Sequence, residues 1–287
     1  MIEILLEPLS YHYMFKAILV CALVGGVCAF LSSYLILKGW SLMGDALAHS
    51  VVPGVALAYL LALPYAVGAF FTGILAALSM AIVKQKTKLR EDAVIGLVFT
   101  SFFATGLLLV SINPTAVSIE AIIFGNILAI SDSDILQVVI ISLICLVALI
   151  VTWRDLVAVF FDENHARSIG LPVRALKIMF FTLLSAACVA ALQTVGACLV
   201  IAMVVTPGAT AYLLTDKFGK LIIIAVLLGS ITSALGAYLS YFLDANPAGL
   251  IVVLQTLLFL STYLFAPKYG FLKTRRAIKK QKRAAHG

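Results

Sequence analysis

The sequence predicts an all-α integral membrane protein, a bundle of about nine transmembrane helices, or eight if one apolar run does not cross the bilayer. Of the 287 residues, 63% are hydrophobic and 11% are charged. Soluble globular proteins average about 45–50% apolar and about 25% charged residues, so the solvent of this fold must be largely lipid. The apolar residues form long continuous runs without the alternation of a membrane barrel, and helices are therefore expected.

Nine stretches are long enough to cross a hydrocarbon core of about 30 Å. They are residues 13–37, 42–63, 65–83, 91–111, 134–152, 175–194, 196–214, 219–241 and 247–266. The second stretch carries Asp45, His49 and Pro53, so we expect it to be broken or distorted. After Asn113 and Pro114 the chain is partly apolar, and we expect a short helix there outside the hydrocarbon.

The basic residues gather in three clusters, at 84–90, 154–177 and 268–283. Each cluster lies at the end of an apolar stretch, where cytoplasmic loops carry Lys and Arg. Even numbers of spans separate the clusters, which is consistent with all three lying in the cytoplasm and would put the N-terminus outside. The net charge of +7 therefore indicates topology and contact with lipid headgroups rather than nucleic-acid binding. We interpret residues 1–287 as one transmembrane domain whose last segment, 267–287, is a basic cytoplasmic tail.

Within KGWSLMGDALAHSVVPGVALAY, residues 38–59, Asp45 and His49 stand four apart and would lie on one face of a helix. Ionisable groups in a membrane span are costly and usually face a pathway or a partner. A carboxylate with an imidazole suits manganese, iron or zinc, but it supplies only two ligands, so a two-fold dimer would be needed for four. Two structural interpretations stay open: the side chains pair with each other, or His49 donates to a backbone carbonyl of a neighbouring helix.

A second stretch, WRDLVAVFFDENHARSIGLPVRALK at 153–177, separates two apolar spans with mixed charge. It is typical of a short amphipathic helix that continues to Ile169 and ends at Gly170, with Pro172 beyond. This helix would be either a docking element for a cytoplasmic partner or a solvated loop, and His165 would be a surface residue.

A third stretch, GACLVIAMVVTPGATAYLL at 196–214, places Pro207 in the middle of a span and predicts a kink. The sequence lacks a G-x-x-x-x-G-K-[ST] phosphate loop, so we do not expect this chain to hydrolyse ATP or to be an enzyme.

In these three stretches the sequence resembles the permease family of metal-ion ATP-binding-cassette importers, the manganese, zinc and iron group. The residues that carry the resemblance are GWSLMGDALAHSVVPGVAL, FFDENHARSIGLPV and VGACLVIAMVVTPGATAYLL. The likeness extends over essentially the whole chain. The sequence GWSLMGDA is closer to that of the manganese and iron importers than to that of the zinc importers. It implies a single permease domain in the bacterial inner membrane, with a fold similar to that of the vitamin B12 and siderophore importers.

The resemblance also implies partners and residue roles. It implies a homodimer, or a heterodimer with a related permease, bound to cytoplasmic ATPase subunits that hold the ATP and supplied by an extracytoplasmic metal-binding protein. Asp45 and His49 would coordinate the transported metal, and no cofactor would stay bound. The segment in contact with the ATPase would comprise Phe161, Asp162, Glu163, His165, Ala166, Ile169 and Gly170.

Two other hypotheses stay open at the level of the sequence. An ATP-independent transporter or channel could use the same pair, and its activity would not depend on residues 161–170. A membrane scaffold would use Asp45 and His49 for stability alone. The ligand types do not distinguish manganese, iron and zinc.

Overall fold

The computed structural model describes residues 7–40, 42–112 and 131–266, and every regular element in these ranges is an α-helix. The helices are α2 (His12–Lys38), α3 (Met43–Ser50), α4 (Val52–Leu60), α5 (Tyr65–Lys86), α6 (Glu91–Ile112), α8 (Asp132–Phe161), α9 (Glu163–Ser168), α10 (Val173–Val195), α11 (Ala197–Leu214), α12 (Phe218–Leu243) and α13 (Pro247–Phe265). The all-α membrane fold predicted from the sequence is confirmed. The expected short helix after Pro114 and the tail 267–287 lie outside the described residues.

Eight helices in the described part of the chain are long and apolar enough to cross a membrane. The predicted nine spans are matched except at α11, where the apolar portion Val200–Leu214 is shorter than the others. α11 continues through Pro207, and the hydroxyl of Ser32 in α2 accepts from the amide of Gly208 and donates to the carbonyl of Val205, both at 3.1 Å. Ser32 thereby partners backbone groups beside a proline, which cannot donate a hydrogen bond itself.

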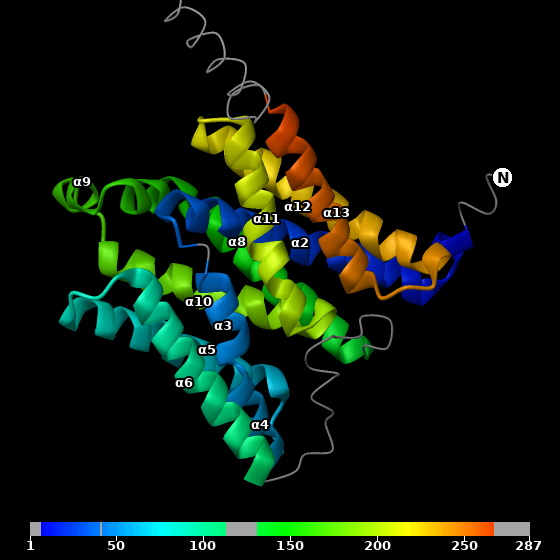
Figure 1. Cartoon of the computed structure of the whole chain (residues 1–287), viewed down its shortest axis with the longest axis horizontal. Helices are drawn as coiled ribbons and strands as arrows, with labels where there is room; N and C mark the ends of the chain where they lie inside the picture. The colour runs from blue at the N-terminus through cyan, green and yellow to red at the C-terminus, as the bar shows by residue number, and fades with distance from the viewer. Residues whose placement is uncertain (1–6, 41, 113–130, 267–287) are drawn as a thin grey trace, which may run out of the picture.

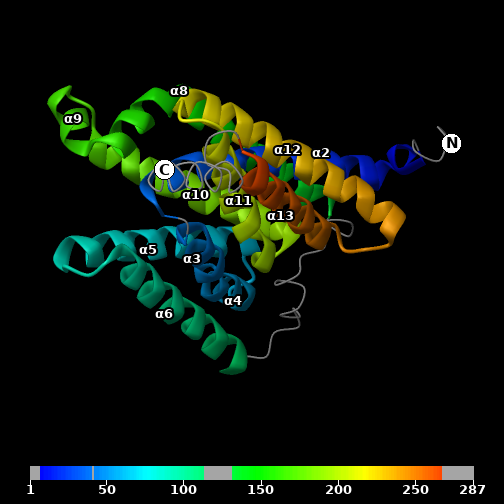
Figure 2. The ribbon, with the colours of Figure 1, turned by 45° about the horizontal axis from the view of Figure 1, so that its top comes forward.

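The long helix α2 is the centre of the bundle and packs against α8, α10, α11 and α12. Small residues let α12 approach closely: a Cβ on Gly25 would come within 2.3 Å of the Ser233 hydroxyl, and one on Gly229 within 2.5 Å of the Ala29 Cβ. Close approach through small residues is the usual means of packing helices in lipid, where burial of apolar surface does not distinguish a neighbour from a lipid tail. Figures 1 and 2 show α5 and α6 on the opposite side of this centre from α12 and α13.

The predicted break in the second span is confirmed, because that span consists of α3 and α4 joined at Val51. Pro53 lies in the first turn of α4. A proline there cannot donate to the preceding turn and its ring crowds the carbonyl four residues earlier, which is that of His49. The break therefore follows directly after the helix turn that carries Asp45 and His49.

Candidate functional site

Asp45 and His49 lie one turn apart on α3, with His49 Nε2 at 3.3 Å from Asp45 Oδ1. Their side chains are 28% and 19% exposed, respectively, so both are largely covered by protein. The separation is within range of an ion pair, but the groups are not aligned as a hydrogen bond, and Asp45 Oδ1 is a buried oxygen without a donor among the described residues. A carboxylate oxygen in this setting is an available acceptor for a cation or a proton donor.

The imidazole of His49 is enclosed by aromatic rings of α6. The ring centroids of Phe99 and Phe103 each lie 5.5 Å from that of His49. Within the described ranges His49 donates to no backbone carbonyl of a neighbouring helix, so the structure does not support that interpretation of the residue. The two phenylalanines were not identified from the sequence, although their four-residue spacing puts them on one helix face.

The pair lies well inside the span. The carbonyl of Gly44, next to Asp45, is 3.9 Å from the Cys188 sulfur, and Cys188 is fifteen residues after the first residue of α10. At about 1.5 Å per residue this is about 22 Å along a helix that crosses a hydrocarbon core of about 30 Å. Gly44 also holds α3 against α11, because a Cβ there would come within 2.6 Å of Val204.

The arrangement offers one oxygen and one nitrogen ligand from this chain. No cluster of three or more His, Cys, Asp or Glu side chains suited to a metal occurs in the parts of the chain that the structure describes. Two ligands bind a metal weakly, which favours transient binding over a permanent structural site. Among the described residues the pair is therefore an incomplete ligand set for a metal.

The segment 161–170 contains a six-residue helix, α9, as expected for a short helix between two spans. Asp162 begins it: its carboxylate accepts hydrogen bonds from the amides of Asn164 at 2.9 Å and His165 at 3.1 Å. The hydrogen bonds from the amides of His165 and Asn164 hold the pKa of Asp162 below its ordinary value. Gly170 ends the segment with a φ of +82°, a conformation that favours glycine.

Side chains of this segment divide into an inner and an outer set. Ala166 is fully buried in the core, so it anchors the helix and is not available to a partner. Glu163 forms ion pairs with Lys177 of α10 and with Arg167. Phe161 and Ile169 are 78% and 57% exposed, and His165 is also exposed, as expected of a surface residue. Figures 1 and 2 show α9 at one extreme end of the bundle.

The chain matches a family model and known proteins over nearly its full length. Residues 10–266 match the model of the ABC 3 transport family. The chain is 68% identical over 275 residues to the chelated iron transport system membrane protein YfeC of Yersinia pestis, covering 96% of this chain and 94% of that protein. It is 50% identical over 271 residues to the manganese transport system membrane protein MntB of Synechocystis sp. (strain ATCC 27184 / PCC 6803 / Kazusa), covering 93% of this chain and 88% of that protein.

A solved structure is also similar. A chain of PsaBC from Streptococcus pneumoniae, determined in complex with Fab, superposes with a TM-score of 0.85 at 33% identity. The similarity covers 96% of this chain and 100% of that chain.

Proposed function

This chain belongs to the ABC 3 transport family, and we propose that it is the membrane-spanning permease of an ATP-driven importer whose cargo is a divalent transition metal. The observation that carries this proposal is the Asp45–His49 pair. It places an oxygen and a nitrogen ligand side by side in the interior of a bundle of lipid-spanning helices. A buried carboxylate oxygen without a donor is costly, and a passing cation would compensate that cost.

Manganese and iron are the favoured cargo, with zinc as the third candidate. The relatives named above are described as iron and manganese transport proteins, and this ligand pair suits either metal. A second copy of this chain, or a related permease, would bring a second pair of ligands to the axis between the two protomers. Two weak half-sites would hold the ion briefly and release it.

We place the α9 end of the bundle in the cytoplasm, because the basic residues of 84–90 and 154–177 gather there. The N-terminus would then lie outside and the tail 267–287 inside, with residues 1–287 forming one permease domain in the bacterial inner membrane.

Phe161 and Ile169 support docking of a cytoplasmic ATPase, which would hold the ATP. Two large apolar side chains exposed at a water-facing end of the bundle suit contact with a partner. Asp162, Glu163, Ala166 and Gly170 hold that surface in shape, and His165 lies on it. An extracytoplasmic metal-binding protein would deliver the ion at the other end.

The test is accumulation of manganese, iron and zinc by cells that carry the complete importer. Wild type is compared with Asp45→Ala and His49→Ala at equal abundance in the membrane, and with the control Asp155→Ala, which removes an exposed carboxylate of α8. We expect both site variants to lose uptake of one metal while they still co-purify with the ATPase, and the control to transport normally. Normal uptake by both site variants would reject the assignment of the pathway.

A further inference from the structure

Trp40 lies between the end of α2 and the start of α3, five residues before Asp45. Its amide donates to the carbonyl of Leu35 at 2.8 Å, just after Gly39 turns the chain with a φ of +71°. The backbone of Trp40 is therefore held by the end of α2. The chain then continues into α3, the helix that carries Asp45 and His49.

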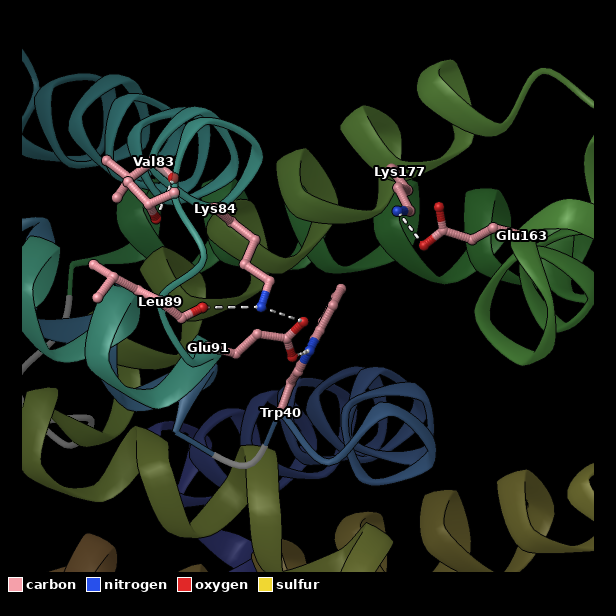
Figure 3. Close-up of polar contacts among 8 residues, drawn as sticks. Trp40, Val83, Lys84, Leu89, Glu91, Glu163 and Lys177 are labelled. Carbon is pink, nitrogen blue, oxygen red and sulfur yellow. Dashed lines mark hydrogen bonds and ion pairs between the residues drawn. The ribbon is translucent and has the colours of Figure 1, made fainter.

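The indole N–H of Trp40 donates to the Glu91 carboxylate, at the first residue of α6. The other oxygen of Glu91 lies 3.5 Å from the Lys84 ammonium, which also donates to the Leu89 carbonyl at 3.3 Å. Figure 3 shows Glu91 between Lys84 and Trp40. A hydrogen bond to an ionised group is stronger than a neutral one, so Trp40 is tied to the turn between α5 and α6.

The same indole packs against two phenylalanine rings from other helices. Its ring centroid is 5.7 Å from that of Phe160 in an edge-on arrangement and 5.7 Å from that of Phe181 in a stacked one. Phe160 is buried and lies two residues before Asp162, which begins α9. A displacement of the docking segment would therefore reach Trp40 through one side-chain contact.

A cavity of about 420 Å³ adjoins Trp40. Trp40 and Met43 line it together with apolar residues of α5, α6 and α10, and the Lys84–Glu91 and Lys177–Glu163 pairs also border it. Both ion pairs are visible in Figure 3. Because well-packed interiors leave little free volume, Trp40 borders one of the less tightly packed parts of the described structure.

We propose that Trp40 is a positioning residue that transmits movement of the docking segment to α3 and so times the release of metal from Asp45 and His49 towards the cytoplasm. This inference rests on the proposed permease function. Trp40 is the residue that joins three parts of the mechanism: the segment that contacts the ATPase through Phe160, the α5–α6 turn through Glu91, and the ligand helix through the chain itself. Its bond to Glu91 holds one position of α3, and breaking that bond uncouples ATP hydrolysis from transport.

The experiment uses the complete importer reconstituted in proteoliposomes and measures metal ions transported per ATP hydrolysed. Trp40→Phe keeps a ring between Phe160 and Phe181 but removes the N–H donor, and Glu91→Ala removes the acceptor. We expect each to lower the ratio about tenfold, about 1.4 kcal/mol, while ATP hydrolysis continues, because the variant loses a contact that couples two distant sites. The double variant should be no worse than either single variant, because both remove the same bond.

The control is Trp153→Phe, which changes the other tryptophan of the chain, beside Arg154 in α8. It should keep the wild-type ratio. Thermal unfolding of each variant accompanies the assay, since a merely structural role would lower stability and both activities together without changing the ratio. If Trp40→Phe does not reach the membrane, Glu91→Ala carries the same prediction with Trp40 intact.

Two results would overturn the inference: a ratio within about twofold of wild type in the single variants, or losses that multiply in the double variant. Asp45→Ala in the same vesicles separates this inference from the proposed function. If Asp45→Ala abolishes transport while the Trp40 and Glu91 variants keep the ratio, the inference alone fails. If Asp45→Ala transports normally, the proposed function fails.

Discussion

Asp45 lies among apolar helices with His49 as its ion-pair partner in the described residues, whereas Asp162 and Glu163 lie at the end of the bundle with two partners each. Asp45 Oδ1 has His49 at 3.3 Å and no aligned donor in the described ranges. Asp162 accepts from two backbone amides, and Glu163 pairs with Lys177 and Arg167. Folding therefore supplies donors to the carboxylates that shape α9, and it leaves the buried Oδ1 atom of Asp45 in α3 without an aligned donor in the described residues. This difference indicates which acidic groups serve structure and which are available to a ligand.

The largest expected effect is at the carboxylate of Asp45. Asp45→Asn keeps the size of the side chain but removes the charge that would bind a cation. We expect metal uptake to fall by at least about tenfold, because even the outer partners of metal ligands cost that much when changed. Stability should not fall, since an uncharged group is less costly to bury.

Uptake of radioactive metal measures the expected loss of transport, and thermal unfolding of the purified protein measures the expected unchanged stability. A loss of stability with normal uptake would instead assign Asp45 to structure, as the scaffold hypothesis requires.

The second effect concerns the exposed apolar residues of the docking segment. Phe161→Asp and Ile169→Asp should each weaken binding of the ATPase by about 2 kcal/mol or more, about thirtyfold, as expected for large residues at an interface centre. Affinity of the purified permease for its ATPase measures the change. Phe265→Asp is the matched control, because Phe265 is 72% exposed at the end of α13 and lies outside this segment.

The ATP-independent alternative makes the opposite prediction for the same variants. A secondary transporter or channel would keep full metal uptake when Phe161 or Ile169 is replaced. If metal uptake survives the loss of ATPase binding, the proposed ATP-driven mechanism is wrong and the secondary transporter or channel is favoured.

A smaller effect is expected at the end of the docking segment. Gly170 has a φ of +82° and open space around its Cα, so an alanine there would meet no neighbour. The cost of Gly170→Ala is then backbone strain alone, about 1 kcal/mol of stability. Gly249→Ala is the control, since Gly249 lies in α13 with equally open surroundings and no positive φ. Thermal unfolding should separate the two variants, and equal midpoints would contradict this account of Gly170.

The sequence was sufficient for the helices, the break after His49 and the short helix at 161–170. Apolar length, Pro53 and the Asp162-to-Gly170 pattern are local signals, and the structure follows them. Which helix faces meet was not predictable, because helices that are apolar all round carry no stripe that marks their inner side. The contacts of His49 with Phe99 and of Trp40 with Glu91 join residues about fifty positions apart, and only the packing of α3 and α6 brings them together.

The smallest expected effect is the pH dependence of the cap at Asp162, which sharpens the contrast between the two regions. Folding lowers the pKa of Asp162 because amides of α9 donate to the ionised carboxylate. The stabilisation is therefore complete above the unfolded value of about 3.9 and is lost as pH falls through the lowered folded value. Asp162→Asn keeps a capping oxygen without the charge, so its difference in stability from wild type should be present at neutral pH and disappear in acid. Thermal unfolding of wild type, Asp162→Asn and the control Asp155→Asn between neutral pH and pH about 3 measures this change, and a difference for Asp162→Asn that does not vary with pH would show that the charge contributes nothing to the cap.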